Sequence, residues 1–427
     1  LIIDIAKLDI VRTGSLFLKF SPEDAQVKLN GKAVKVSFGV LSGGALIKNL
    51  RPGMYEIEVA RPGCVLPKPC AKEGVSAWKK TLRIESGRVT SATRIILWPE
   101  NFISKTLDNE NLESFYVAED AVVTKKNKEL FFDTGVLKGT NVASVSSRSR
   151  SIITEGVLKN YYLVDLDAPK TPVNVTSLFN SLKQTKLKLP GTVPIKDIFF
   201  HPFSSNKIIL STENAIYVLD PSKIELEKVL GLLSINAVAI SQNEVFAINT
   251  SGTIESFDLT LRRKNTAPFS IQEVARMSAS KNGRFLALNK TSGELLVFDR
   301  EKSSLTLLDK SAPKNWLDPE GKRIAYLNKQ GELFIYHLED FDLDERHEKG
   351  TLLTIDGNAD SFEWLSEFPN YALISSEGGL SISEIYSRGS TINRYEVSRD
   401  ATKYFYVKKN LYLLDENGAL TKISLTF

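Results

Sequence analysis

The feature that most limits the fold of this chain is a repeat of about 40 residues in its C-terminal three quarters. A large apolar residue recurs in one column, at Phe199, Val238, Met277, Trp316, Trp364 and Tyr395. The first three intervals are 39 residues each, and the next two are 48 and 31 residues. Repeats of this length are each too small to bury their own apolar faces, so neighbouring repeats must pack together and should close into a ring.

A second column shows what each repeat contains. A turn residue, usually glycine, is followed six positions later by a residue that is usually aspartate, as in GTIESFD (252–258) and GELLVFD (293–299). This pattern predicts a hairpin whose last aspartate opens the next turn. We expect Asp220, Asp258, Asp299 and Asp415 to be such turn residues, because an aspartate side chain can accept hydrogen bonds from its own backbone.

About four strands in each repeat indicate a β-propeller over residues 99–427. We predict about seven blades. The first two, around residues 115–133 and 151–165, are irregular, so that six and eight blades stay open. The longest interval is explained by an insertion at residues 337–350. We interpret Trp316 and Trp364 as core residues within the blades and not as part of a cofactor site.

Residues 14–98 are a different, non-repetitive unit. Short alternating strands are separated by turn residues at Pro22, Asn30-Gly31, Arg51-Pro52-Gly53 and Ser86-Gly87. Strands at roughly ten-residue spacing, without a helical period, predict a small β-sandwich. The expected fold class is therefore all-β, with a sandwich followed by a propeller.

The N-terminal unit resembles the PEGA domain, a β-sandwich module of bacterial and archaeal surface proteins. The matching segments are PEDA (22–25), NLRPGMYEIEVARPG (49–63) and WKKTLRIESGRV (78–89), in the order that the family has. Asp24 replaces the family's glycine, so we expect a positive φ there. The repeats, as in SASKNGRFLALNKTSGELLVFD (278–299), are similar to WD40-like propellers of the TolB type.

Composition excludes several classes of function. Hydrophobic residues make up 42% and charged residues 25% of the 427 residues, which is typical of a folded soluble protein. Three histidines, His201, His337 and His347, and two cysteines make a metal centre or a histidine-dependent catalytic site improbable. We predict no catalytic residue, metal or cofactor. Cys64 and Cys70, six residues apart among prolines, could form a disulfide or remain two free thiols.

The charge is uneven along the chain. Residues 1–100 contain 16 Lys and Arg against 9 Asp and Glu, although the whole chain carries only +4. A basic N-terminal unit would suit an anionic cell-wall polymer or a membrane surface. Nothing indicates specific nucleic-acid binding, because the aromatic pairs are better explained by packing between strands.

The resemblance implies a non-enzymatic protein of the cell envelope. The sandwich would be a spacer or adhesive unit, and the propeller loops would bind a protein or a glycan. Residues 1–13 would be a linker from an N-terminal membrane anchor outside this sequence, which places the protein outside the cytoplasm. A propeller hydrolase or its accessory domain is the main alternative, although the sequence lacks a Gly-x-Ser-x-Gly motif. A scaffold at the inner leaflet of the cytoplasmic membrane is the third.

Overall fold

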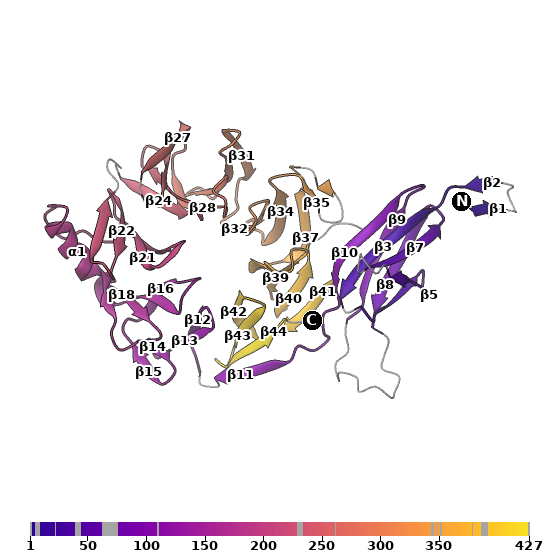
Figure 1. Ribbon diagram of the computed structural model, residues 1–427, viewed down its shortest axis with the longest axis horizontal. Coiled ribbons are helices and arrows are strands. Elements are labelled where there is room, and N and C mark those ends of the chain that lie inside the picture. Colours follow the sequence, from indigo (N-terminus) through magenta and orange to yellow (C-terminus); the bar gives the residue numbers. More distant parts are fainter. Residues whose placement is uncertain are drawn as a thin grey trace.

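The computed structural model confirms an all-β chain (Figure 1). It describes residues 2–4, 9–21, 23–38, 44–61, 76–108, 111–228, 234–260, 262–342, 346–347, 349–350, 352–377, 379–385 and 392–425. Within these residues the strands form ten four-stranded sheets and two two-stranded sheets. One α-helix, α1 (Val175–Thr185), lies among them. None of the described helices is long and apolar enough to cross a bilayer.

Two of the four-stranded sheets come from the N-terminal part of the chain, which we call the N-terminal module. One sheet has the order β10 (Val89–Ile96), β3 (Gly14–Ser21), β7 (Ala45–Leu50), β6 (Ser37–Phe38). The other has the order β5 (Lys32–Val34), β4 (Gln26–Leu29), β8 (Gly53–Ala60), β9 (Trp78–Ile84). Apolar residues alternate along these strands, and both sheets contribute to one core that includes Leu16, Leu18, Val27, Ile57 and Trp78.

The predicted turn between β4 and β5 is confirmed at Asn30 and Gly31, whose φ angles are 48° and 75°. Two positive φ angles in a two-residue turn match the twist of a hairpin, which explains the Asn-Gly pair. The expectation of a positive φ at Asp24 is wrong. Its carboxylate accepts a hydrogen bond from Arg61 Nε at 2.9 Å, so that a surface ion pair holds this loop.

The range that we interpret as a linker contains a short hairpin of β1 (Ile2–Asp4) and β2 (Asp9–Val11).

Eight four-stranded antiparallel sheets form the remainder of the described chain, and we number these blades one to eight by their first strand. The first strands lie toward the centre of the ring (Figure 1) and are β12 (Ser114–Ala118), β16 (Asn141–Val145), β20 (Asp197–His201), β24 (Ile235–Ile240), β28 (Val274–Ala279), β32 (Lys314–Leu317), β38 (Ser361–Trp364) and β42 (Ala401–Val407). The second strands are β13 (Ala121–Lys126), β17 (Ser151–Glu155), β21 (Ser204–Ser211), β25 (Glu244–Asn249), β29 (Phe285–Lys290), β33 (Arg323–Leu327), β39 (Tyr371–Ser376) and β43 (Asn410–Asp415).

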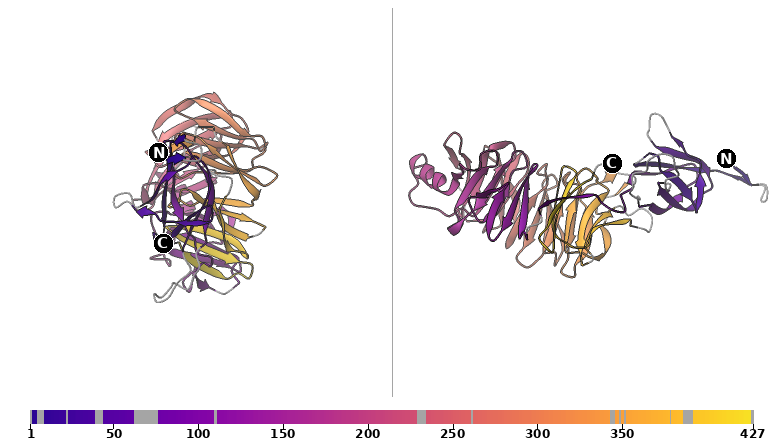
Figure 2. Two further views of the ribbon diagram at one scale, coloured as in Figure 1. Left: turned by 90° about the vertical axis from the view of Figure 1, so that its right-hand side faces the viewer. Right: turned by 90° about the horizontal axis from the view of Figure 1, so that it is seen from below.

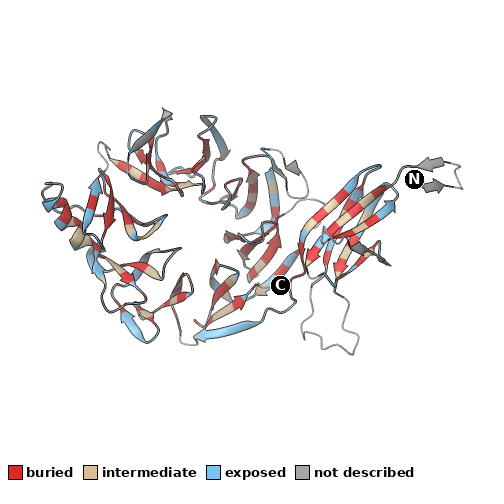
Figure 3. Cartoon of the chain, viewed as in Figure 1, coloured by how far each residue is buried: buried red, intermediate tan, exposed pale blue. Residues whose placement is uncertain are grey.

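The third strands are β14 (Glu129–Phe132), β18 (Tyr161–Asp165), β22 (Ile216–Asp220), β26 (Thr253–Asp258), β30 (Leu295–Asp299), β34 (Glu332–His337), β40 (Gly379–Glu384) and β44 (Leu420–Ser424). The fourth strands, toward the perimeter, are β15 (Gly135–Leu137), β19 (Val173–Asn174), β23 (Glu225–Lys228), β27 (Arg263–Ser270), β31 (Ser304–Asp309), β37 (Leu352–Asn358), β41 (Arg394–Ser398) and β11 (Ser104–Asp108). Burial is greatest in the second and third strands, whereas fourth strands such as β11 and β15 are largely exposed (Figure 3).

The ring is closed by both ends of the repeat region. Blade eight combines β42, β43 and β44 with β11 from the start of the region, and Ser104 pairs with Ile423. Each pair of neighbouring blades shares one hydrophobic cluster, including the pair of blades eight and one, where Phe115 packs with Tyr412. The prediction of a β-propeller is therefore confirmed, and every blade buries its faces against two neighbours.

The repeat pattern gave one blade too few and placed two residues, Tyr395 and Asp415, in the wrong columns. The described residues form eight blades, where we predicted about seven with six and eight left open. Tyr395 lies in β41, the fourth strand of blade seven, and not in the first strand of the next blade. The first strand of blade eight is β42, in which Tyr404 pairs with Leu413 and Tyr406 pairs with Leu411 of the second strand. Short apolar strands of similar composition stand in both places, so the spacing alone misassigned the position.

Two other expectations concern the blade cores and the insertion. Trp364 is buried, and its Nε1 donates to the backbone oxygen of Trp316 at 3.1 Å, which confirms that this pair belongs to the core of blades six and seven. The inserted segment contains a small hairpin of β35 (Phe341–Asp342) and β36 (Arg346–His347). The helix α1 lies in the connection between blades two and three, where Val175, Phe179 and Leu182 are buried.

The N-terminal module projects from the perimeter of the ring and contacts blade seven (Figures 1 and 2). The Lys80 ammonium pairs with the Glu384 carboxylate at 3.2 Å, and both side chains are almost completely buried. Trp78 Nε1 also donates to Glu384, at 3.2 Å, and Asn393 Nδ2 donates to it at 2.8 Å. We call this group of four residues the joint.

A second group of contacts extends the joint along β10. The Tyr371 hydroxyl accepts a hydrogen bond from the backbone N–H of Ile96 at 3.1 Å. Trp98 is fully buried in the core that blades seven and eight share, with edge-on contacts to Phe368 and Tyr371. Because polar and apolar groups are both buried here, the connection between module and ring is a packed interface, unlike the exposed linker that usually separates domains.

Candidate functional site

The hairpins of the blades divide the ring into two faces. In an antiparallel four-stranded blade, the turns after the first and third strands lie at one end, and the turn after the second strand lies at the other. The joint involves Asn393, between the third and fourth strands of blade seven. We call the corresponding face the module face and the opposite one the far face.

The recurring aspartates are turn residues, as predicted, but they do not share one face. Asp220 and Asp258 end third strands and lie on the module face, whereas Asp415 ends the second strand of blade eight and lies on the far face. Asp220 accepts hydrogen bonds from the backbone N–H groups of Ser222 and Lys223. Asp258 accepts one from Thr260, and Asp415 accepts one from Asn417. Hydrogen bonds to the Asp258 carboxylate, chiefly the one from the Thr260 hydroxyl, hold its pKa below the usual value. These carboxylates therefore accept hydrogen bonds from the backbone of their own turns.

On the module face, arginines link neighbouring blades. Arg284 of blade five pairs with Asp299 of its own blade and with Glu339, which follows the third strand of blade six. Arg323 of blade six donates to Asp318 and to the backbone oxygen of Pro369 in blade seven, at 2.7 and 3.0 Å. Asp299, Glu339 and Asp318 are therefore paired with arginines. Glycoside hydrolysis instead needs two carboxyl groups that face the substrate.

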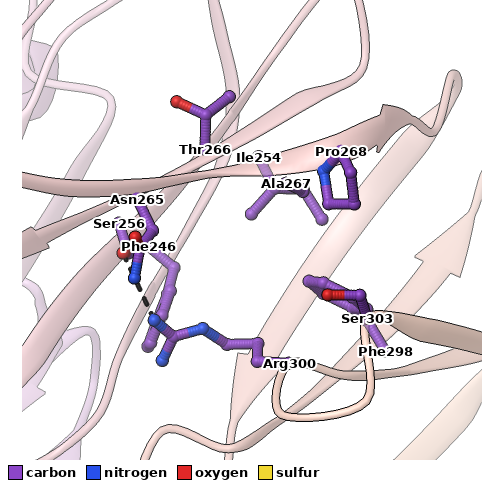
Figure 4. Close-up of a pocket in the computed structure, with 10 residues that line it drawn as sticks. All are labelled: Phe246, Ile254, Ser256, Asn265, Thr266, Ala267, Pro268, Phe298, Arg300 and Ser303. Atoms are coloured by element: carbon purple, nitrogen blue, oxygen red, sulfur yellow. Dashed lines mark hydrogen bonds between the residues drawn. The ribbon is translucent and has the colours of Figure 1, made fainter.

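A hollow of about 250 Å³ opens between blades four and five (Figure 4). Its apolar part is formed by Phe246, Ile254, Ala267, Pro268 and Phe298, and its polar part by Ser256, Asn265, Thr266, Arg300 and Ser303. The hollow depends on an irregular edge strand. Between the pairs Thr253↔Ser270 and Glu255↔Thr266, β27 contains two extra residues, so that it bulges away from β26. Pro268 lies in this bulge and has no N–H with which to continue the ladder.

Among the described residues that line this hollow, Arg300 carries the charge. Its guanidinium lies 4.7 Å from the centre of the Phe246 ring and pairs with Glu244 of blade four. It also donates to the Gly283 backbone oxygen at 2.7 Å and to Ser256 Oγ at 3.3 Å (Figure 4). The arginine is consequently fixed, with its side chain 20% exposed.

The described lining residues of this hollow are apolar groups and polar groups without a histidine or a carboxylate. The volume matches one or two amino-acid side chains, and the walls supply aromatic surface together with guanidinium and amide donors. These groups suit a ligand with both an apolar part and an oxygen acceptor.

A second hollow, of about 350 Å³, lies beside the joint and is lined by residues of the module and of blades six and seven, among them Arg94, Glu320 and Glu367. Burial opposes ionisation of Glu367, but hydrogen bonds from Ser366 and Tyr406 hold its pKa below the usual value. This carboxylate is therefore a structural acceptor between blades seven and eight.

The Glu363 carboxyl group lies between the first strands of blades seven and eight, and its pKa is shifted in the opposite direction from that of Glu367. Burial raises the pKa of Glu363 to about 8, so that this side chain is largely protonated at neutral pH. Nearby, the hydroxyls of Ser361 and Tyr404 form a hydrogen bond of 2.9 Å between these two strands. Glu363 is a single neutral acid among tyrosines.

Few of the residues that form these sites were predicted from the sequence. Cys64 and Cys70 lie outside the described residues. Glu384 of the joint was missed, although it stands six positions after Gly378, where other repeats have aspartate. Pro268, in an otherwise extended segment, was an available signal for an irregular edge strand. Nothing in the spacing indicated that Arg300 and Asn265 would line one hollow.

Comparisons with known proteins give no family for this chain. No protein-family model matches it, and no curated protein does. Among solved structures it is similar to Hsv2p of Kluyveromyces lactis, with 11% identity, a TM-score of 0.44 and coverage of 67% of this chain and 98% of that one. It is also similar to the Cps50 (Swd1) β-propeller domain of Myceliophteria thermophila, with 15% identity, a TM-score of 0.41 and coverage of 69% and 100%. A chain of the mitotic checkpoint complex matches with 12% identity, a TM-score of 0.43 and coverage of 76% and 97%.

Proposed function

We propose that this protein is a non-enzymatic binding platform, in which the propeller holds a segment of a partner protein and the N-terminal module acts as a rigid spacer. The observation that carries the proposal is the hollow between blades four and five. It combines aromatic walls, a fixed arginine and a bulged edge strand at one place on the ring. An extended peptide could insert a side chain into the hollow while its backbone follows β27.

The chemistry of the hollow favours a peptide with an acidic or amide side chain. The Arg300 guanidinium is partly exposed and held by Glu244 and Phe246, so that a ligand would meet it already in position. Asn265 and Thr266 are exposed beside it. A hydrolase would instead need a nucleophile with a base or a pair of free carboxylates, and the residues that line the hollow provide neither.

Residues 14–98 are proposed to be a separate β-sandwich of the PEGA type. The resemblance in PEDA (22–25) and in the two later segments supports this assignment, as does the single core that its two sheets share. The buried joint between Lys80 and Glu384 would make the module a stiff arm for the propeller. We further propose an extracytoplasmic location at the cell envelope, with the basic module next to an anionic polymer.

A peptide display library tests the binding platform. Random peptides are selected on the full chain, and their affinities are then compared with an Ala267→Trp variant, which fills the hollow, and a Thr306→Trp variant on the neighbouring edge strand. We expect Ala267→Trp to weaken the selected peptides about tenfold or more and Thr306→Trp to leave them unchanged. Selected peptides that bind all three proteins equally, or a selection that enriches no peptide, would refute the proposal. A glycan array in parallel would reveal a carbohydrate ligand in its place.

The envelope location is tested through the cysteines. Protein isolated from its native cells in the presence of an alkylating reagent should have Cys64 and Cys70 joined by a disulfide, because disulfides persist in oxidising compartments. Two alkylated cysteines in fresh material, together with recovery in the cytoplasmic fraction, would contradict this location. Neither result bears on the hollow, so the two parts of the proposal are tested separately.

A further inference from the structure

The hairpin between β17 and β18 of blade two ends in an apolar tip on the far face. Its residues are Val157, Leu158 and Lys159, and the Val157 and Leu158 side chains are 75% and 91% exposed. Leu158 has the highest exposed fraction of the large apolar side chains that the structure describes. The tip is tied at its base, because Gly156 N–H donates to the Asn160 backbone oxygen at 2.7 Å and Asn160 Nδ2 donates to that of Val157 at 3.0 Å.

The backbone of the tip is poor for the residues that occupy it. Leu158 has φ 59° and ψ 32°, and Lys159 has φ 55°. This left-handed region suits glycine or asparagine and disfavours leucine. Since the Leu158 side chain is almost fully in water, it also gains nothing from burial. Leu158 therefore does little for folding, and a strained, exposed residue of this kind suggests a role outside the fold.

The surroundings of the tip are basic. Lys159 belongs to it, and Lys138 from the adjacent blade lies with its ammonium 5.6 Å from the centre of the Tyr162 ring. The segment of residues 168–196, which includes α1, contains five lysines and no acid, but Lys183 is buried, Lys196 donates to backbone oxygens of blade four, and Lys170 lies on the module face. The acid of the hairpin itself is Glu155, at the end of β17. The helix α1 starts beside the hairpin, because the Tyr161 backbone N–H donates to Thr176 Oγ1 at 2.9 Å. Lys186 and Lys188 at the end of this helix are exposed.

We propose that this tip docks the propeller onto an anionic lipid bilayer surface, with Val157 and Leu158 in the boundary between headgroups and acyl chains. The lysines around the tip would contact the lipid phosphates. The site differs from the hollow between blades four and five and does not depend on it. It also lies on the side of the ring opposite the N-terminal module, as the positions of β18 and β9 in Figure 1 indicate.

Geometry favours a bilayer over a protein as the occupant. A stable protein interface buries about 800 Å² on each partner, and two apolar side chains on a convex tip supply only a small part of such an area. A bilayer accepts single apolar side chains at its interface, and lysines within a Debye length of an anionic surface add to the attraction. A convex apolar tip with exposed lysines beside it fits that surface.

Vesicle sedimentation with the full chain tests this proposal. Vesicles of phosphatidylcholine alone are compared with vesicles in which part of it is replaced by phosphatidylglycerol, at low and at high salt. The tip variant is Leu158→Asp, and aspartate tolerates the left-handed backbone better than leucine, so that folding is preserved. The matched control is Ile224→Asp, since Ile224 is also exposed (56%) with φ 56° at a hairpin turn, but on the module face of blade three.

We expect the wild-type chain and Ile224→Asp to bind the anionic vesicles and to lose them at high salt. Leu158→Asp should bind about tenfold more weakly or worse, because it replaces an inserting side chain by a charge that the lipids repel. A Lys138→Glu, Lys159→Glu double variant should lose the preference for phosphatidylglycerol. No binding of the wild type to anionic vesicles, or equal binding of Leu158→Asp, would overturn the proposal. Equal binding of wild type to both kinds of vesicle would overturn its electrostatic part.

Discussion

Removing the carboxylate at the centre of the joint should separate the N-terminal module from the ring. In Glu384→Ala, the buried Lys80 ammonium loses the carboxylate that lies 3.2 Å away, and Trp78 and Asn393 lose an acceptor. Breaking a buried ion pair from one side costs about 3–5 kcal/mol, since the remaining charge stays in a poor solvent. The hydrogen bonds that Trp78 and Asn393 lose are part of the same desolvation cost, so we expect a total loss of about 4 kcal/mol.

The companion variants make this estimate specific. Lys80→Met removes the other charge but leaves Glu384 its two neutral donors, so it should cost less, about 2–3 kcal/mol. Replacing both residues, by methionine and glutamine, should recover most of the loss, because no buried charge then remains. The coupling between the two positions should therefore be at least about 1.5 kcal/mol in a double-mutant cycle.

Calorimetry and urea unfolding followed by tryptophan fluorescence are the assays, since Trp78 and Trp98 both lie at the interface with blade seven. In the Glu384→Ala variant we expect a separate transition for the N-terminal module at a lower temperature than that of the ring. A single unshifted transition, or two single variants whose effects simply add in the double variant, would refute the view that this ion pair couples module and ring.

Three further predictions follow from single residues. Because the pKa of Glu363 is raised to about 8 by burial, stability should fall as pH rises from the usual glutamate value toward 8, by up to about 1.4 kcal/mol per pH unit. Glu363→Gln should abolish that slope in unfolding curves at acidic and alkaline pH, and an unchanged slope would contradict the assignment. Leu158→Gly should raise the unfolding free energy by about 0.5–1 kcal/mol, since it relieves the left-handed backbone, and a decrease would contradict that explanation. Gly252→Ala should destabilise by more than about 2 kcal/mol, because φ is 82° and a new Cβ would lie 2.5 Å from the Ile271 oxygen. Gly31→Ala, with φ 75° and open space around it, is the control that isolates the backbone effect in the same thermal scan.

The sequence was informative where local chemistry repeats and uninformative where strands from distant segments meet. The aspartate turns and the Asn30-Gly31 hairpin depend on a few neighbouring residues, so their spacing revealed them. Blade eight takes one strand from residues 104–108 and three from the end of the repeat region, so no contiguous repeat represents it. The count of blades was consequently too low.

The candidate sites depend even more than the fold on contacts between residues that are far apart in the sequence. Arg300 and Glu244 come from different blades, and the hollow beside them exists because β27 bulges at Pro268. Sequence shows a proline in a strand but not which side chains then face the gap. The exposed tip was equally hidden, since the apolar pair Val157-Leu158 has the composition of any short strand. Only its placement in a left-handed turn distinguishes it.

The closure of blade eight also has a consequence for the order in which the molecule can form during synthesis. The strand β11 leaves the ribosome early, yet its partner β44 ends at Ser424, and the joint connects Trp78 with Glu384, 306 residues later. The completed N-terminal module and the first seven blades therefore wait, with β11 unpaired, for the last strands of blade eight. Contacts of such high sequence separation fold slowly. A nascent chain should thus become protease-resistant in one late step, and until then β11 is an exposed edge that another nascent chain could pair with.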